Sequence, residues 1–332
     1  MPDASSTPSA TPSATPPADA PEVLTVARLW PRMMEALRGA YRVHDRTHLE
    51  DPTAFAALAP RIRAISASGE SKVPRELIAQ LPALEVISVF GVGYDGVDVA
   101  AARERGIAVT HTPNVLNDEV ADLAMALMLA VSRRLVEADR YVRSGQWAKG
   151  PMPLARKVSG ARLGIVGLGR IGLAIAKRAE AFGMSIAYTA RSAKTDTSYP
   201  YLPSAEALAA EVDFLIVITP GGAGTRKLID AKVLAALGAK GYLINVARGS
   251  VVDEQALVAA LQNGTIAGAG LDVFESEPNV PSALFALDNV VLTPHIGSAT
   301  WQTRQAMADL AFGNLQAHFA GRPLLSPVPE MK

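Results

Sequence analysis

The 332-residue sequence contains no cysteine, carries no net formal charge and has no long apolar run. Without cysteine there can be no disulfide or thiolate ligand, and the five histidines form no HExxH motif, so we expect no metal site. Lys plus Arg and Asp plus Glu both total 32, which gives no electrostatic reason to expect a nucleic acid or acidic membrane as partner. The longest apolar run, residues 120–131, contains Asp122 and is too short to cross a bilayer. These absences favour a soluble, cytoplasmic protein.

The first 22 residues repeat Thr-Pro-Ser-Ala and contain hardly any large apolar side chain. Such a segment cannot bury enough surface to offset the entropy cost of ordering it. It also lacks the basic and apolar regions of a secretory signal and the arginines of a transit peptide. We predict a disordered tail over residues 1–22.

Beyond this tail, short β-type runs alternate with helical ones, which is typical of parallel sheets with helices on both faces. A first set of strands is predicted at residues 24–29, 41–44, 62–67, 84–90 and 108–110. A second set is predicted at residues 163–166, 185–189, 214–218, 241–245, 267–273 and 290–293. A long helix from Glu119 to about Gly145, capped by Asn117 or Asp118, connects the two sets.

A last helix, expected over about residues 300–319, follows the second set of strands. Because it lies beyond that sheet, we expect it to return and cover the first domain. The predicted division is therefore a discontinuous domain, residues 23–115 with 302–332, and an inserted domain, residues 116–301.

Residues 158–194 form the segment around which the inserted domain is organised. A β-type run leads into GLGRIG, and a helical pattern and a second β-type run follow. Gly167 permits the turn, Gly169 lets the backbone approach a pyrophosphate, and Gly172 lets the helix pack on the strand. The free N–H groups and dipole of the helix N-terminus favour the same ligand. The segment indicates a dinucleotide-binding unit rather than a glycine turn that only packs.

The end of the second β-type run selects the cofactor. An NAD site places Asp or Glu about 20 residues after the glycines to bind the ribose 2′-hydroxyl. Here the corresponding positions hold Arg191 and Ser192, with Lys194 just beyond, and no acid. A guanidinium, a hydroxyl and an ammonium can bind a 2′-phosphate through charge-assisted hydrogen bonds. We therefore expect NADPH, and NADH remains possible if these residues form an ordinary solvated loop.

Three later strand ends supply an arginine, an acid and a histidine, and ligands of open α/β sheets bind at the carboxyl ends of strands. The guanidinium of Arg248 suits a carboxylate next to a carbonyl oxygen. His295 is a candidate proton donor because its reference pKa lies near operating pH. In GLDVFESEP, Asp272 can accept a hydrogen bond from a nicotinamide carboxamide, and either Glu275 or Glu277 can orient the imidazole and favour its protonated form. Spacing alone does not choose between the two glutamates.

The order GLGRIG, NVARGS, GLDVFESEP and TPHIGSAT closely resembles the D-isomer-specific 2-hydroxyacid dehydrogenase family over about residues 60–320. The resemblance implies an α/β protein of two doubly wound parallel sheets, with a Rossmann nucleotide-binding domain inserted into a flavodoxin-like substrate domain. It assigns catalysis to Arg248, Glu277 and His295. The segment VFGVGYDGVD resembles the family's substrate-carboxylate loop, with the N–H groups of Val92 and Gly93 as donors. The family is commonly homodimeric, so we expect a homodimer.

Within the family, Arg191, Ser192 and RSGQWAKG resemble the NADPH-linked glyoxylate/hydroxypyruvate reductase branch. In that branch the tryptophan, here Trp147, reaches the partner subunit's substrate pocket. The expected substrate contacts are Val92, Gly93, Arg248, His295 and Trp147. The expected cofactor contacts are Gly167, Gly169, Arg170, Ile171, Gly172, Arg191, Ser192, Thr219, Pro220, Asp272 and Gly297.

We hypothesise an oxidoreductase that reduces small 2-oxo acids, glyoxylate or hydroxypyruvate, to D-2-hydroxy acids with NADPH. Two alternatives stay open. Trp301 near the expected pocket and the Ser-Gly-Glu sequence at residues 68–70 depart from the branch, so hydroxyphenylpyruvate or another 2-oxo acid remains possible. A nucleotide-sensing scaffold, similar to the corepressors that share this fold, is the alternative of a different class.

Overall fold

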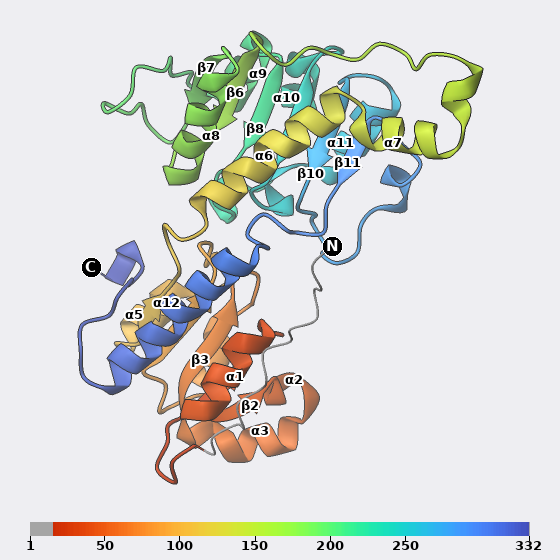
Figure 1. Cartoon of the computed structure of the whole chain (residues 1–332). Helices are drawn as coiled ribbons and strands as arrows, with labels where there is room; N and C mark the ends of the chain where they lie inside the picture. The colour runs from red at the N-terminus through yellow and green to blue at the C-terminus, as the bar shows by residue number, and fades with distance from the viewer. Residues whose placement is uncertain (1–15, 332) are drawn as a thin grey trace. The chain divides into compact units, whose positions relative to one another are not determined.

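The computed structural model describes residues 16–331, which divide into two compact units (Figure 1). Unit 1 consists of the described residues up to Val115 and those from Trp301 onward, and unit 2 is Leu116–Thr300. The predicted tail lies, for residues 1–15, outside the described part of the chain. Among residues 16–331, none of the helices combines the length and apolar character that a membrane crossing requires.

Unit 1 is built on a parallel sheet of five strands in the order β2-β1-β3-β4-β5. This is the flavodoxin-like order that was predicted from the family resemblance. The strands are β1 (Glu22–Thr25), β2 (Arg42–Asp45), β3 (Ile62–Ser68), β4 (Val86–Phe90) and β5 (Ala108–Thr110). The helices are α1 (Pro31–Ala40), α2 (Thr47–Glu50), α3 (Pro52–Leu58), α4 (Arg75–Ala79), α5 (Val99–Glu104) and α12 (Trp301–Phe319).

The last helix, α12, packs in unit 1 although it is far away in sequence from the other elements of that unit. In Figure 1 it is the blue helix among red and orange elements. It crosses β4, where the Ser88 hydroxyl donates to the carbonyl of Ala311 at 2.9 Å, and the ring of Phe319 packs against that of Tyr41. The chain therefore leaves unit 1 once and returns to it.

The start of β1 corrects the predicted extent of the tail. Glu22 already belongs to the strand and is buried, and its carboxylate accepts from Arg61 Nε at 2.8 Å and contacts His44 Nε2 at 3.0 Å. Ala20 is also buried, with its N–H bonded to the carbonyl of Pro17. These polar contacts attach the residues to the sheet. The tail was predicted from its lack of large apolar side chains, and that criterion does not detect polar contacts.

Unit 2 contains a parallel sheet of six strands in the order β11-β10-β9-β8-β6-β7. On the free side of β7, Tyr188 forms an isolated parallel bridge with Tyr201. That bridge occupies the position of the third strand in the Rossmann order 3-2-1-4-5-6. The strands are β6 (Arg162–Val166), β7 (Ser185–Thr189), β8 (Phe214–Val217), β9 (Tyr242–Asn245), β10 (Gly268–Leu271) and β11 (Val290–Leu292).

The single helix predicted from Glu119 to Gly145 is wrong, because the structure contains two helices, α6 (Asn117–Ser132) and α7 (Leu135–Arg143). The Ser132 hydroxyl donates to the carbonyl of Met128, and Arg134 has a left-handed φ of 52° that ends the helical path. The predicted cap is also wrong, since Leu116 precedes α6 and no side chain caps it. The other helices of unit 2 are α8 (Arg170–Ala181), α9 (Ala205–Glu211), α10 (Ala231–Leu237) and α11 (Glu254–Gln262).

Short 3-10 turns complete the described chain. They mostly lie at strand ends and in the loops between elements. Their bounds are Ala59–Arg61, Gln146–Lys149, Ala223–Thr225, Gly249–Val251, Ser282–Leu284 and Pro329–Met331.

Candidate active site

Two glycines of the β6–α8 turn are positions where no side chain fits. Gly167 has a φ of +103°, and a Cβ there would lie 2.9 Å from both the carbonyl oxygen of Ile218 and the nitrogen of Thr219. A Cβ on Gly172 would lie 2.3 Å from the carbonyl oxygen of Gly167. These contacts bring the first turn of α8 against the end of β6 and place Thr219 beside the turn.

The third glycine is different, because a Cβ on Gly169 would meet no protein atom within 4 Å. Gly169 precedes α8, and no side chain caps that helix. The N–H groups of Arg170 and Ile171, at the start of the helix, have no partner within it. Open space beside unpaired N–H groups and a positive dipole end fits the pyrophosphate of a dinucleotide.

The loop after β7 has a fixed backbone and exposed basic side chains. The hydroxyl of Tyr188, a residue only 1% exposed, accepts from the N–H of Lys194 at 2.7 Å. The ring of Tyr201 packs on that of Tyr188 at 5.5 Å. Arg191 and Ser192 lie on the exposed side of this loop. The loop therefore presents a guanidinium and a hydroxyl on a backbone that the buried tyrosine holds.

Asp272 lies at the carboxyl end of β10 and binds the loop that carries His295. Its Oδ1 accepts from Thr293 Oγ1 at 2.7 Å and from the N–H of Ile296 at 2.8 Å, and its Oδ2 accepts from the N–H of Gly297 at 2.8 Å. Burial raises the pKa of this carboxyl, and these hydrogen bonds counteract only part of the shift. The hydrogen bond between Asp272 and Gly297 therefore helps to fix the conformation of the loop that carries His295, independently of any contact with a cofactor.

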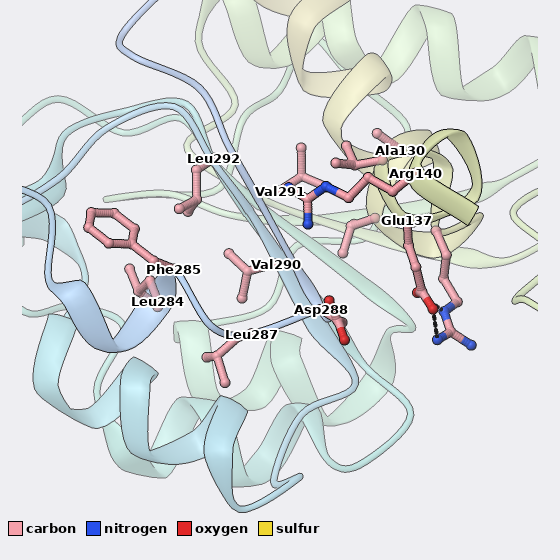
Figure 2. Close-up of a pocket in the computed structure, with 13 residues that line it drawn as sticks. Ala130, Glu137, Arg140, Leu284, Phe285, Leu287, Asp288, Val290, Val291 and Leu292 are labelled. Atoms are coloured by element: carbon pink, nitrogen blue, oxygen red, sulfur yellow. Dashed lines mark hydrogen bonds and ion pairs between the residues drawn. The ribbon is translucent and has the colours of Figure 1, made fainter. Parts of the chain in front are cut away.

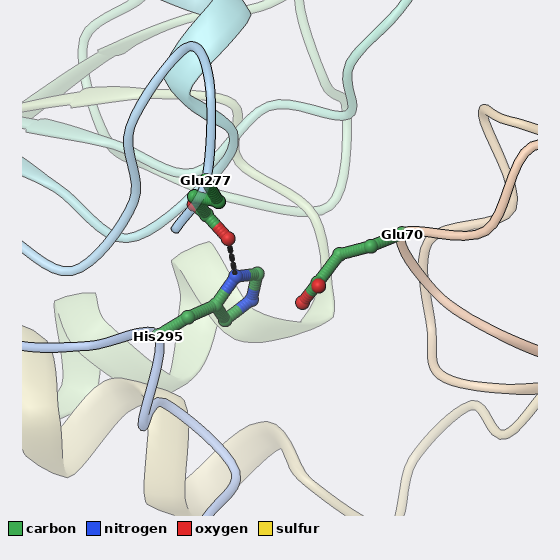
Figure 3. Close-up of side chains that lie close together, drawn as sticks. All are labelled: Glu70, Glu277 and His295. Atoms are coloured by element: carbon green, nitrogen blue, oxygen red, sulfur yellow. Dashed lines mark hydrogen bonds and ion pairs between the residues drawn. The ribbon is translucent and has the colours of Figure 1, made fainter. Parts of the chain in front are cut away.

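His295 and Glu277 form a hydrogen-bonded pair at this edge of the sheet (Figure 3). The Glu277 Oε2 lies 2.7 Å from His295 Nδ1, and its Oε1 accepts from the N–H of Phe274 at 2.8 Å. Both carboxylate oxygens are thus engaged, which fixes the carboxylate against the imidazole. His295 also has a φ of 52°, a conformation that non-glycine residues adopt mainly where the surroundings impose it.

The structure distinguishes the two glutamates that spacing left equivalent. Glu275 turns to the side, where its Oε1 lies 3.1 Å from Arg226 Nη2. Its own N–H donates to Glu254 Oε1 at 3.1 Å. Glu277, not Glu275, is therefore the acid that contacts His295.

Arg248 follows β9 and is held by its neighbours. Its carbonyl accepts from Asn245 Nδ2 at 3.1 Å, and its Nη1 donates to the carbonyl of Ala247 at 2.8 Å. The next residue, Gly249, lies against the backbone of Phe274, whose N–H binds Glu277. Unit 2 thus links the arginine loop to the acid and histidine through main-chain contacts.

In unit 1 the loop after β4 exposes two main-chain donors. Within residues 16–331, neither the N–H of Val92 nor that of Gly93 makes a hydrogen bond. The carbonyl of Val92 is held at 2.9 Å by His111 Nδ1, and Gly91 packs against Gly69, where a Cβ would come within 2.8 Å of the Gly69 Cα. Two unpaired N–H groups on a fixed turn suit a carboxylate.

Trp147 and Pro220 lie in more open surroundings. Trp147 is 68% exposed in the turn after α7 and has no aromatic partner among the described residues. Pro220 is exposed after β8, and its carbonyl accepts from Thr225 Oγ1 at 2.7 Å.

Sequence reasoning missed two residues that position the site, Tyr188 and Asn245. It named Asp272 but missed the hydrogen bonds by which Asp272 binds the His295 loop. Asn245 ends β9 and Asp272 directly follows β10, and each precedes a functional loop. A polar residue at the end of an apolar strand was therefore the available signal. Nothing in the sequence separates the buried hydroxyl of Tyr188 from an ordinary strand tyrosine.

Comparison with known proteins gives consistent matches. The family model described as the NAD binding domain of D-isomer specific 2-hydroxyacid dehydrogenases matches residues 125–297. A glyoxylate/hydroxypyruvate reductase A of Arabidopsis thaliana is 54% identical over 80% of this chain and 85% of its own length. A hydroxyphenylpyruvate reductase of Plectranthus scutellarioides is 54% identical (82% and 88% covered), and a 2-ketogluconate reductase of Gluconobacter oxydans is 47% identical (93% and 98%).

Among solved structures, an NADPH-dependent glyoxylate/hydroxypyruvate reductase from Sinorhizobium meliloti, in complex with NADP and malonate, is similar to this chain. It is 49% identical, with a TM-score of 0.87. The match covers 94% of this chain and 98% of that one. The similarity therefore extends over both units.

Proposed function

The chain belongs to the D-isomer-specific 2-hydroxyacid dehydrogenase family, and we propose that it reduces glyoxylate and hydroxypyruvate to their 2-hydroxy acids with NADPH. As a member it is an NAD(P)-dependent oxidoreductase. The observation that carries the assignment is the 2.7 Å contact between Glu277 Oε2 and His295 Nδ1, on a loop that Asp272 binds. A carboxylate fixed on one nitrogen of an imidazole is the usual arrangement for a histidine that transfers a proton.

The residues of the chain divide the reaction between them. We assign the substrate carboxylate to the N–H groups of Val92 and Gly93, and its carboxylate and ketone to the guanidinium of Arg248. Because Glu277 engages Nδ1 of His295, the proton for the ketone oxygen comes from Nε2. Bound NADPH supplies the hydride that reaches C2 of the acid. One hydride and one proton together convert the 2-oxo group, an aldehyde in glyoxylate and a ketone in hydroxypyruvate, to the alcohol.

The proposed cofactor site uses the open space at Gly169 for the pyrophosphate and the loop at Arg191 and Ser192 for the 2′-phosphate. We include Arg170 and Ile171, which begin α8 directly after Gly169, and Thr219 and Pro220, which follow β8 beside Gly167. NADH lacks the 2′-phosphate, so it should bind the same site more weakly.

A second candidate substrate is hydroxyphenylpyruvate, which the relative in Plectranthus scutellarioides is named for. The scaffold alternative is not proposed, since Arg248, Glu277 and His295 are all present and Glu277 and His295 are paired. The absence of cysteine and the use of NADPH suit a reducing compartment, and we propose the cytoplasm.

We further propose a homodimer formed through α7. No residue of this helix is buried, and its apolar side chains Leu135, Val136 and Val142 are exposed. In Figure 1, α7 and the chain after it extend away from the sheet of unit 2. Apolar surface of this kind usually marks an interaction site. Trp147 lies in this extension and would then contact the second copy.

A hollow of about 150 Å³ lies beside α7. Figure 2 draws the residues that line it. Its lining includes Val136 and Phe285, and the Phe285 ring is 66% exposed. This hollow offers a second copy a place for its side chains. Replacing both Leu135 and Val142 with serine should convert the dimer to a monomer in sedimentation, whereas a wild-type monomer would refute the dimer.

The assay that tests the function follows absorbance at the nicotinamide band. Glyoxylate, hydroxypyruvate, pyruvate and hydroxyphenylpyruvate are each run with NADPH and with NADH. We expect the highest kcat/KM for glyoxylate or hydroxypyruvate with NADPH. A higher kcat/KM with hydroxyphenylpyruvate would favour the second candidate, and no turnover with any acid would refute the proposal.

A further inference from the structure

Two tryptophans and an arginine form an exposed cluster in unit 1. The rings of Trp30 and Trp301 meet edge to face, with their centroids 6.0 Å apart. The guanidinium of Arg32 lies 5.7 Å from the Trp30 centroid and 5.5 Å from the Trp301 centroid. Trp301 is nevertheless 70% exposed, although burying an indole contributes large apolar stabilisation. The cluster is thus preformed and still open on one side.

This Trp30–Arg32–Trp301 cluster lies at the carboxyl edge of the unit 1 sheet. Trp30 ends the loop from β1 to α1, so it belongs to that edge. Trp301 begins α12, and Arg304, one helical turn later, lies 5.7 Å from the ring of Phe90. Phe90 is the last residue of β4 and directly precedes the turn that holds Val92 and Gly93. The cluster and the two free N–H groups therefore share one edge of one sheet.

The strand order sets the spacing along this edge. β3 lies between β1 and β4, so the loop with Trp30 is two strand spacings, about 10 Å, from the loop with Val92. A two-carbon acid whose carboxylate is bound at Val92 and Gly93 ends well short of the cluster. The carbon chain of a five- or six-carbon 2-oxo acid covers much of that distance.

We propose that Trp30, Arg32 and Trp301 form a subsite for the hydroxylated carbon chain of longer 2-oxo acids, the 2-keto sugar acids. This inference rests on the proposed 2-oxo acid reductase function and specifies its substrate class. The electron-rich indole faces pack against the C–H groups of a sugar chain. Arg32 carries five N–H donors, of which one bonds to Gln305 Oε1 at 3.4 Å, and the others can donate to hydroxyls.

The polar part of the cluster favours a hydroxylated substrate chain over an aromatic one. The guanidinium of Arg32 lies beside both indole rings, and a benzene ring has no hydrogen-bond acceptor for its N–H groups. Covering polar groups without giving them hydrogen bonds costs binding free energy. A chain of hydroxyls supplies acceptors at each carbon, so it matches both the indoles and the guanidinium.

The experiment compares kcat and KM for 2-keto-D-gluconate, hydroxypyruvate and glyoxylate, all with NADPH. The variants are Trp301→Ala, Trp301→Phe and Arg32→Gln. The control is Leu325→Ala, which removes another exposed apolar side chain of the same unit. We expect Trp301→Ala and Arg32→Gln each to raise KM for 2-keto-D-gluconate about tenfold. In both variants kcat/KM for glyoxylate should stay within about twofold of the wild-type value. Trp301→Phe, which keeps an aromatic ring, should retain a KM for 2-keto-D-gluconate much closer to that of the wild-type enzyme.

Three results would refute the proposed subsite. The first is a wild-type enzyme that reduces glyoxylate but not 2-keto-D-gluconate. The second is an unchanged KM for 2-keto-D-gluconate in both Trp301→Ala and Arg32→Gln, and the third is an equal loss of kcat/KM with all three acids. Equal loss would identify a general effect on unit 1, which thermal unfolding of the same variants would show. No turnover by the wild-type enzyme with any acid would instead refute the reductase function, and this inference with it.

Discussion

The backbone of Gly249 lies directly against that of Phe274. A Cβ on Gly249 would be 1.9 Å from the carbonyl carbon of Phe274 and 2.0 Å from its oxygen. The N–H of Phe274 donates to Glu277 Oε1, whose other oxygen contacts His295. The loop of Arg248 and the acid–histidine pair are thus connected by a short path of backbone contacts.

Gly249→Ala should therefore damage both stability and catalysis. The added methyl group must displace the backbone of Phe274, which typically costs about 1–3 kcal/mol. The same displacement moves Glu277, so we expect kcat to fall while KM for NADPH changes little. Thermal unfolding and steady-state kinetics check both effects. Gly39→Ala, in a helix with open space around its Cβ, is the control and should keep wild-type kinetics and be at least as stable as the wild-type protein.

Alanine substitutions at Gly169 and Gly172 test cofactor binding and protein stability separately. A Cβ on Gly169 meets no protein atom, so Gly169→Ala should fold normally but raise KM for NADPH, because the methyl group occupies the proposed pyrophosphate space. A Cβ on Gly172 meets the carbonyl of Gly167 at 2.3 Å, so Gly172→Ala should lower the unfolding temperature. If Gly169→Ala binds NADPH as tightly as the wild-type protein, the pyrophosphate is bound elsewhere.

Glu277→Gln tests the positioning of His295. The amide oxygen can still accept from the N–H of Phe274, so we expect the variant to fold, but the negative charge beside Nδ1 is lost. We expect kcat to fall about 10–100-fold, less than the roughly 10²–10⁴-fold that general acid–base catalysis typically contributes, because His295 itself is retained. The pH profile of kcat should change as well. Glu275→Gln is the control, because Glu275 contacts Arg226 instead. Equal kcat values for the two variants would contradict the assignment.

Cofactor preference should depend on Arg191 and on the tyrosine beneath its loop. Arg191→Ala removes a charged hydrogen-bond donor, which is worth about 10–100-fold in KM for NADPH, and it should leave KM for NADH unchanged. Tyr188→Phe removes the acceptor for the N–H of Lys194 and should weaken NADPH binding in the same selective way, to a smaller extent. A parallel rise in both KM values would mean that the loop acts on the whole cofactor site.

Acid should destabilise unit 1 partly through Glu22. Burial raises the pKa of this carboxyl, but the bonds from Arg61 and His44 outweigh burial and bring the pKa below its ordinary value of 4.5. The folded state therefore binds the proton less readily than the unfolded state, so this contribution to stability is present above pH 4.5 and is lost as the pH falls through the folded pKa. Glu22→Gln should flatten the decrease of the urea midpoint below pH 5, whereas the exposed Glu50→Gln should not.

The sequence predicted central strands such as β4 and β8 well, because their apolar runs are buried on both faces and bounded by turn residues. The strand predicted at residues 24–29 was less accurate, since β1 spans Glu22–Thr25. Arg248, His295 and the acids could be named because each follows such a strand. Two features were beyond that reasoning. The break between α6 and α7 depends on the left-handed Arg134 in an otherwise regular helical pattern, and the choice of Glu277 depends on where the Phe274 N–H points. Both are set by tertiary contacts rather than by composition or period.

The third strand of the Rossmann order survives here only as the bridge between Tyr188 and Tyr201. Residues 190–200 consequently contribute no ladder of hydrogen bonds to the sheet. The same residues carry the side chains proposed to bind the 2′-phosphate of the cofactor. Insertions, deletions and exchanges in this segment can accumulate without disturbing the strands that hold Arg248 and His295. The coenzyme choice of such an enzyme can therefore drift in evolution, or be redesigned by loop grafting, independently of its catalytic chemistry.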